Sequence, residues 1–175
     1  HFEVLTPDID EKAIGSRAEG DAEALVRLIA AAKADALVAR LAESIDSTDN
    51  RILLSGDQVV TYDGAIREKP IDLSECYEFI QSYSRKPCAT VGAICLHSLA
   101  SGKRVLGVHQ ASVHFKQIPE AIIDQLIQRD GSTLMECAGG LMIEHDLIQP
   151  YIQDIQGGID SIMGLCTHLL VDLLN

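Results

Sequence analysis

The spacing of apolar residues along the chain predicts four helices. Between residues 21 and 43, apolar side chains recur at i, i+3, i+4, i+7 and i+11, the repeat of one helix face. Asp21 is a suitable N-cap for this helix. Similar spacing predicts helices at 73–83 and from Pro119, at N1, to Gly131, which would close that helix. A final helix follows Gly157-Gly158, with Asp160 or Ser161 as its cap.

Runs rich in β-branched residues, or alternating between apolar and polar, predict the strands. They lie at residues 2–5, 51–62, 88–98 and 105–115, and the last two form an antiparallel hairpin around Gly102. The polar stretch 44–50 is a predicted loop, and residues 143–155 predict short strands or turns. Because helices and strands interleave, we expect an α/β fold, a mixed central sheet with flanking helices, in a single domain spanning residues 1–175.

Charge and composition narrow the class of partner. Lysine and arginine total 14 against 26 acidic residues, a formal net charge of −12, which argues against nucleic acid as the main partner. No apolar segment reaches the ~18 residues of a membrane span, and no signal peptide is visible. The five cysteines form no C-x-x-C pair, which favours reduced thiols. We therefore expect a cytoplasmic protein that binds neither membrane nor nucleic acid; a nucleotide remains compatible with this charge.

The most informative feature is a polar pair inside an apolar strand. Asp57-Gln58 separates the apolar run 52–54 from Val59-Val60. A carboxylate in a buried strand is costly unless it is paired or binds a cation, so such an interruption indicates a functional site. After the Asp63-Gly64 turn, Lys69 precedes Pro70, so this hairpin could hold a metal-bound polyphosphate.

Acidic residues elsewhere could complete a metal site. Asp10 and Glu11 lie in a loop, and Glu11 together with Asp57 could hold Mg²⁺ or Mn²⁺ through hard oxygen ligands. Lys33 and Lys69 could neutralise charge that develops on phosphates. Each also has an ordinary structural interpretation: the acids as solvated surface, Lys69 as a surface lysine and Lys33 as a snorkelling side chain.

Several familiar catalytic motifs are missing from the sequence. The chain has no Walker phosphate loop, no G-x-G-x-x-G, no H-E-x-x-H and no G-x-S-x-G. Its six histidines, His109 and His114 among them, show no metal-ligand spacing. Ser161 is better explained as a helix cap than as a nucleophile.

Taken in order, several short segments resemble the Maf (septum-formation protein) family of nucleoside triphosphate pyrophosphatases. They are Pro-Asp-Ile-Asp-Glu at 7–11, Ala-Lys-Ala at 32–34, Gly-Asp-Gln-Val-Val at 56–60 with Glu-Lys-Pro at 68–70, Ala-Thr-Val-Gly at 89–92, Cys-Ala-Gly-Gly at 137–140 and Asp-Ser-Ile-Met-Gly-Leu at 160–165. Each motif alone is weak, but their order along nearly the whole chain makes a chance agreement improbable.

The resemblance implies an inosine-triphosphatase-like fold with a cleft between two lobes. It also implies hydrolysis of a nucleoside triphosphate, modified or non-standard, to the monophosphate and pyrophosphate with a divalent cation. Asp57 would then be the catalytic carboxylate, either as the base that activates water or as a metal ligand, and Glu11 would assist at the metal or select the substrate. Lys33 and Lys69 would bind phosphate and assist catalysis, and Gln58 would position the substrate. Family members are often dimers, so a homodimer is compatible with the resemblance.

Two departures from the family pattern qualify this interpretation. The family begins with a strand and a Ser/Arg loop that grips the phosphates, and nothing before His1 supplies them, so we expect an N-terminally truncated chain. The segment at 143–145 is more similar to the subgroup that takes 7-methyl-GTP than to the subgroup that takes dTTP and UTP. Glu144 would accept hydrogen bonds from a guanine edge, or would be a surface residue. The alternative function is a non-catalytic nucleotide-binding or interaction module that lacks the phosphate loop.

Overall fold

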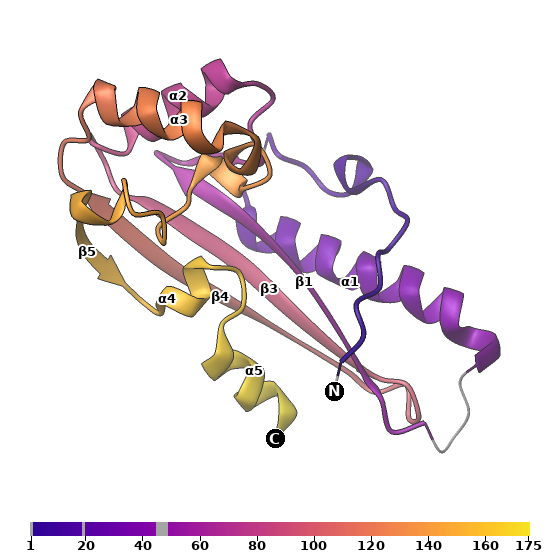
Figure 1. The fold of residues 1–175 in the computed structure, drawn as a ribbon. Helices are drawn as coiled ribbons and strands as arrows, with labels where there is room; N and C mark the ends of the chain where they lie inside the picture. Colours follow the sequence, from indigo (N-terminus) through magenta and orange to yellow (C-terminus); the bar gives the residue numbers. More distant parts are fainter. Residues whose placement is uncertain (1, 19, 45–48) are drawn as a thin grey trace.

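A computed structural model describes residues 2–18, 20–44 and 49–175 of the chain (Figure 1). Within these residues, five strands form one antiparallel sheet in the order β2-β1-β3-β4-β5. The strands are β1 (Ile52–Tyr62), β2 (Ala65–Arg67), β3 (Cys88–Ser98), β4 (Arg104–Phe115) and β5 (Ile152–Gln156). The mixed α/β prediction is confirmed, and so is the predicted hairpin, which is formed by the two long strands β3 and β4.

Helices cover the two faces of the sheet. They are α1 (Ala22–Leu41), α2 (Leu73–Ser82), α3 (Glu120–Leu134), α4 (Ile159–Ile162) and α5 (Thr167–Leu174). Val59 packs in the core under α1, whereas the next residue, Val60, packs in the core on the opposite face, which includes residues of α2, α3 and α4. In Figure 1, α1 runs along one side of the sheet, while α2 and α3 lie above one end of it. Since successive strand residues point to opposite faces, Asp57 belongs to the α1 face and Gln58 to the other.

The N-terminal part of the prediction is partly right. Asp21 caps α1, its carboxylate accepting a hydrogen bond from the Ala24 backbone N–H at 2.9 Å. The strand predicted at residues 2–5 is wrong: within the described residues no strand is assigned there, and Phe2 and Val4 are exposed. Alternating apolar residues form a strand only where a neighbouring strand can hydrogen-bond to them. The predicted loop at 44–50 includes residues 45–48, which lie outside the described part of the chain.

Two predictions about helix ends are also wrong. Pro119 is the N-cap of α3 rather than its first residue. The helix continues past Gly131 to Leu134 with a kink at Asp130, where φ is −133° and ψ is 23°. A Cβ at position 131 would lie 3.1 Å from a methyl carbon of Leu73 in α2. Gly131 therefore allows two helices to approach closely, and it does not terminate one of them.

The predicted C-terminal helix is two helices in the structure. Gly164, with φ of 111°, lies in the break between α4 and α5. Asp160 lies in α4, but its carboxylate accepts hydrogen bonds from the N–H and hydroxyl of Thr167 at 2.7 and 2.5 Å and so caps α5. Ser161 is not a cap; it lies inside α4, and its hydroxyl contacts His109 at 2.5 Å. In the described part of the chain, no helix has the length and hydropathy to cross a bilayer.

Arg67 fixes the end of β2, immediately before the Glu68-Lys69 pair. Its guanidinium carbon lies 4.0 Å from the Tyr62 ring centroid and 4.4 Å from that of Phe79. The guanidinium also donates a hydrogen bond to the hydroxyl of Ser82 at 2.8 Å. Cation–π contacts of this kind become stronger when they are shielded from water. Arg67 thus ties the short strand to α2 and places the next two residues.

We expect Arg67→Met to lower the free energy of unfolding by about 1–3 kcal/mol, because it loses the cation–π contacts and leaves a buried hydroxyl without its donor. Urea denaturation with an unchanged m-value would measure this loss. Arg85 is exposed, and Arg85→Met is the matched control, with an expected change within about 0.5 kcal/mol. Equal losses in the two variants would contradict the role given to the aromatic contacts.

Candidate active site

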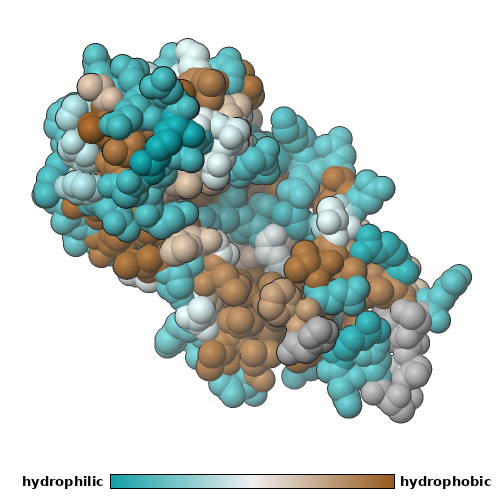
Figure 2. Space-filling view, viewed as in Figure 1, coloured by the Kyte–Doolittle hydropathy of each residue, from teal (hydrophilic) through white to brown (hydrophobic). Residues whose placement is uncertain are grey.

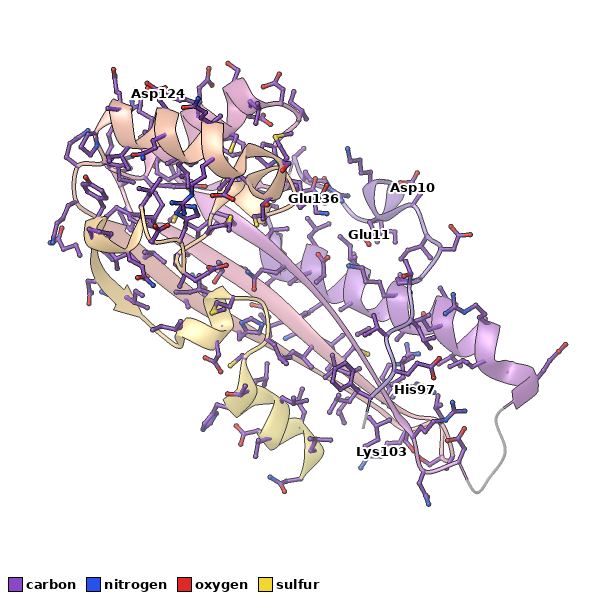
Figure 3. All side chains as sticks on the ribbon, viewed as in Figure 1. Asp10, Glu11, His97, Lys103, Asp124 and Glu136 are labelled. Atoms are coloured by element: carbon purple, nitrogen blue, oxygen red, sulfur yellow. The ribbon has the colours of Figure 1, made fainter. Side chains whose placement is uncertain are left out.

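A cavity of about 970 Å³ opens beside β1, and its lining includes five acidic residues. These acids are Glu11, Asp57, Glu68, Glu136 and Glu144. Figure 2 shows hydrophilic side chains gathered in the hollow between the two bulky parts of the molecule. In Figure 3, Glu11 on its short N-terminal helix and Glu136 just after α3 lie on either side of this space. The cavity is therefore shared by segments that are far apart in the sequence.

The edge of β1 explains how side chains from both sheet faces reach one cavity. β2 pairs only with Val60, Thr61 and Tyr62. Among the described residues, 52–59 of β1 thus have a strand partner on one side only, β3. Asp57 and Gln58 point to opposite faces, yet both line the cavity, because it extends around this unpaired edge.

Lys33 joins two of the predicted site residues. Its ammonium nitrogen lies 2.9 Å from a carboxylate oxygen of Asp57 and 3.1 Å from one of Glu11. The Lys33 and Asp57 side chains are only 16% and 10% exposed, so little water screens this pair. Lys33 comes from the middle of α1, and Glu11 from η1 (Glu11–Ala13), a single 3₁₀ turn that Asp10 caps. One ammonium group thus holds together a helix, a strand and a loop.

The pKa of both partners in the Lys33–Asp57 pair is raised, that of Asp57 mainly by burial and that of Lys33 by its two acidic neighbours. Burial raises the pKa of Asp57, the hydrogen bond and charge of Lys33 lower it, and the charges of Glu11 and Glu68 raise it again; the net direction is upward. Burial lowers the pKa of Lys33, but hydrogen bonds and charges from Asp57 and Glu11 outweigh that effect, so its pKa is also raised. Burial is therefore the main cause of the Asp57 shift, with the charges of Glu11 and Glu68 adding to it, and the acidic neighbours of Lys33 make this a place that favours a bound cation.

Arg17 fixes the loop that carries Glu11. Its guanidinium makes two hydrogen bonds to the Glu68 carboxylate, at 3.0 and 3.2 Å. The same group donates to the backbone carbonyls of Glu11 at 3.0 Å and Lys12 at 3.2 Å. Bidentate arginine–carboxylate pairs are well defined in geometry. The position of Glu11 therefore depends on a pair formed by residues 51 positions apart.

Lys69 lies at the mouth of the cavity in an exposed ion pair. Its ammonium nitrogen is 2.7 Å from a carboxylate oxygen of Glu136, and the two side chains are 61% and 74% exposed. Exposed pairs of this kind contribute ~0–1 kcal/mol. Lys69 can therefore leave Glu136 for an anionic ligand at little cost.

Gln58 and Glu144 bring different polar groups to the cavity. The Gln58 amide nitrogen donates to the backbone carbonyl of Ile162 at 2.8 Å. Its amide oxygen is buried and is the one buried side-chain polar atom in the described residues without a hydrogen-bond partner. Glu144 is exposed at the cavity wall. Both are thus available as hydrogen-bond acceptors.

The carboxylates suit a divalent cation that also binds phosphate. Within the described residues, no three Asp, Glu, His or Cys side chains are grouped as a closed metal site. Glu11 and Asp57 nevertheless converge on one positive charge, the Lys33 ammonium. Mg²⁺ in nucleotide sites commonly uses one or two carboxylates and takes its other ligands from water and phosphates. The two residues therefore fit such an ion.

The predicted site residues come together, with one difference in placement. Asp57, Glu11, Gln58, Lys69 and Glu144 all line the cavity. Lys33 is not among its lining residues, although it contacts Asp57 and Glu11.

Sequence reasoning missed three residues of the site: Arg17, Glu68 and Glu136. Arg17 and Glu136 have no sequence signal, because their partners are distant along the chain. Glu68 could have been inferred from its place beside Lys69-Pro70.

The fold and site define an α/β protein with an acidic cleft at the edge of an antiparallel sheet. Comparison with known proteins gives the family. The model of the Maf-like protein family matches residues 1–175, so the chain belongs to this family, and the predicted family is confirmed.

Curated relatives carry nucleotide pyrophosphatase names. A 7-methyl-GTP pyrophosphatase of Dictyostelium discoideum is 38% identical over 175 residues, covering 99% of this chain and 85% of the relative. Another protein with that name, from Pseudomonas aeruginosa, is 28% identical over 99% of this chain and 84% of its own length. A dTTP/UTP pyrophosphatase of Chlamydia caviae is 27% identical over 99% and 82%.

We expect Lys33→Met to raise the pKa of Asp57 further, because the hydrogen bond and charge of Lys33 are the interactions that lower it. Titration of the Asp57 carboxyl carbon by NMR would measure this shift without any substrate. Lys12 also lines the cavity, and Lys12→Met is the matched control, with no shift expected. A pKa of Asp57 that stays the same or falls in Lys33→Met would show that the ion pair does not set its ionisation.

Proposed function

We propose that this protein is a nucleoside triphosphate pyrophosphatase that hydrolyses a modified or non-standard nucleotide to the monophosphate and pyrophosphate. The observation that carries the proposal is the net acidic Glu11–Lys33–Asp57 cluster, in which Lys33 and Asp57 are largely buried, beside a cavity large enough for a nucleotide. Family membership and the names of the relatives support the same reaction.

Asp57 is proposed as the base for the attacking water. Its raised pKa makes its carboxylate a stronger base than an ordinary aspartate, while the Lys33 ammonium keeps it ionised. The main role proposed for Lys33 is therefore to keep Asp57 ionised, because the two side chains are in contact. The family resemblance also implies a direct contact of Lys33 with phosphate, which we propose as its second role. Asp57 itself is held on a long strand that is paired with β3 along its length, which limits its movement relative to a bound substrate.

Glu11 and Asp57 are the proposed ligands of Mg²⁺ or Mn²⁺. When bound, such an ion supplies charge stabilisation on phosphate oxygens and lowers the pKa of coordinated water. Arg17 keeps Glu11 in place through the Glu68 pair. Lys69, on the other wall, exchanges Glu136 for the phosphate chain and neutralises charge on the leaving pyrophosphate.

For the substrate we propose a 7-methylguanine nucleotide. A 7-methylated guanine carries a positive charge on its ring system, and its Watson–Crick edge carries N–H donors. The exposed Glu144 carboxylate at the cavity wall supplies a negative charge and hydrogen-bond acceptors. The relative that is 38% identical is named for 7-methyl-GTP.

The test is pyrophosphate release from 7-methyl-GTP, GTP, dTTP, UTP and CTP with Mg²⁺ or Mn²⁺. We expect Asp57→Asn to lower kcat at least about 100-fold, because the amide cannot accept a proton. Wild-type activity should fall as the pH drops through the raised pKa of Asp57, since protonation removes the base. Asp124, on the outer side of α3 in Figure 3, gives the matched control Asp124→Asn, with activity unchanged.

Two results would contradict this assignment. Near-native turnover in Asp57→Asn would remove Asp57 from the mechanism, and full activity after chelation of divalent ions would remove the metal. Nucleotide binding without any pyrophosphate release in the wild type would support the non-catalytic module instead.

Preference among nucleotides depends on Glu144 in this proposal. We expect Glu144→Gln to lower kcat/KM for 7-methyl-GTP about tenfold, equivalent to about 1.4 kcal/mol. The value of kcat/KM for GTP should change less, because only the methylated base is cationic. The ratio of the two kcat/KM values measures the effect. Glu120→Gln, an exposed site at the start of α3, is the control. If the ratio of kcat/KM for 7-methyl-GTP to that for GTP is unchanged in Glu144→Gln, Glu144 is an ordinary surface residue without a role in base recognition.

A further inference from the structure

Three residues form a row across the sheet beside the cavity. Gln58 of β1 is paired with Gly92 of β3, and Gly92 is paired with His109 of β4. A Cβ at position 92 would lie 2.4 Å from Nε2 of His109 and 3.3 Å from Oε1 of Gln58. The side chains of Gln58 and His109 thus both lie over the glycine, and position 92 accommodates no larger residue without displacing them.

A short helix covers this row and is bound to it at two points. His109 Nδ1 lies 2.5 Å from the hydroxyl of Ser161, and both residues are buried. Burial lowers the pKa of His109, so the ring is neutral at pH 7 and pairs with the hydroxyl as donor or acceptor. The next residue of α4, Ile162, accepts the hydrogen bond from Nε2 of Gln58. The His109–Ser161 contact therefore fixes the carbonyl that orients the Gln58 amide.

That orientation leaves one acceptor without a partner. A backbone carbonyl can only accept a hydrogen bond, so Nε2 of Gln58 must face Ile162 and the amide cannot be reversed. Oε1 is consequently fixed on the other side, buried and unpartnered. A buried acceptor without a donor carries its full desolvation penalty. Oε1 lies over Gly92, and Gln58 itself lines the cavity, so this unpartnered acceptor indicates a donor that a bound ligand would bring.

The cavity wall around Gln58 suits a nucleobase. Val60, Ile143, Ile162 and Met163 line the same cavity and supply apolar surface for the faces of a flat ring. The carboxylates and lysines proposed to bind the metal and phosphates are separate groups. A base therefore has apolar contacts and an acceptor available that the phosphate chain does not use.

We propose that Oε1 of Gln58 accepts a hydrogen bond from a ring or amino N–H of the nucleobase, and that His109 and Ser161 are positioning residues for this contact. The inference rests on the proposed function only in taking the ligand to be a nucleotide. Guanine presents N1–H and N2–H donors on one edge, which match the Gln58 oxygen and the Glu144 carboxylate. Adenine has an acceptor at N1 and no amino group at C2, and its amino group lies at C6, where guanine has a carbonyl oxygen. A base bound in the orientation of guanine therefore offers Oε1 no donor, and adenine is disfavoured.

The first experiment measures dissociation constants of GMP, IMP and AMP by calorimetry, so that no turnover is required. We expect the wild type to bind GMP about 5- to 150-fold more tightly than AMP, the range for one unpaired buried acceptor. In Gln58→Met, which keeps the side-chain length but has no acceptor, the ratio should approach one. IMP retains N1–H and lacks the amino group. If IMP binds as tightly as GMP, the contact is made by N1–H. If IMP binds as weakly as AMP, the contact is made by the amino group.

The second experiment tests the two positioning residues. We expect Ser161→Ala to raise KM for the guanine nucleotide about 2- to 13-fold with kcat unchanged, because the base contact loosens while Asp57 is untouched. His109→Asn keeps an amide near the Ser161 hydroxyl and should retain most of the affinity, whereas His109→Leu should not. His114 lies on the opposite face of β4, and His114→Asn is the control without effect.

The outcomes separate this inference from the proposed function. A GMP-to-AMP ratio that is unchanged in Gln58→Met would overturn the base contact, even if pyrophosphate release depends on Asp57 as proposed. A ratio that collapses in Gln58→Met supports the contact, even if Asp57→Asn retains turnover. If kcat and KM change together in Ser161→Ala, or if His109→Leu retains as much affinity as His109→Asn, His109 and Ser161 have only a structural role. Their assignment as positioning residues would then be overturned. Failure of the wild type to bind any of the three nucleotides would overturn the base contact alone, because pyrophosphate release from the triphosphates tests the proposed function separately.

Discussion

The buried contact of Lys33 with Asp57 and Glu11 is the interaction on which the site depends. A carboxylate on the helix-covered face of a central strand would be costly without a partner, and Lys33 supplies one at 2.9 Å. Its reach requires α1 to lie close to β1, and small residues make that approach feasible: Ala30 and Ala34 are fully buried against the sheet. The hydroxyl of Ser55 donates to the carbonyl of Ala30 at 2.8 Å and fixes the same spacing. The packing of α1 thus determines the electrostatics at Asp57.

Strand geometry divides the cavity between two kinds of chemistry. Asp57 and Gln58 are adjacent, so the pleat sends them to opposite faces, and the unpaired edge of β1 lets both reach one space. The face with Asp57 has the largely buried charge of Lys33 and the half-exposed charge of Glu11. The face with Gln58 has apolar residues and amide or hydroxyl groups. A ligand with a polyanionic end and a flat, hydrogen-bonding end matches this division.

The sequence predicted features that depend on local patterns and missed those that depend on long-range contacts. The interrupted strand at Asp57, the Asp21 cap and the β3–β4 hairpin follow from periodicity and local hydrogen bonding, and the structure has all three. The order of the family motifs predicts that Gln58 and Lys69 lie near Asp57, and all three line the cavity. Arg17 has no comparable signal, because its bonds to Glu68 arise only once the chain has folded. The strand at residues 2–5 failed for the related reason that alternation does not supply a pairing partner.

Charge balance gives the strongest physical argument for a metal with the substrate. Five carboxylates line the cavity, against the lysines Lys12 and Lys69, while the ammonium of Lys33 is already engaged. A nucleoside triphosphate carries several negative charges, so this cavity would repel the free anion. A divalent cation held by Glu11 and Asp57 changes the sign of that interaction where the phosphates must lie. Burial is the main cause of the raised pKa of Asp57, and the charges of Glu11 and Glu68 add to it. The same excess of acid makes the proposed site selective for a metal-bound nucleotide over a free one.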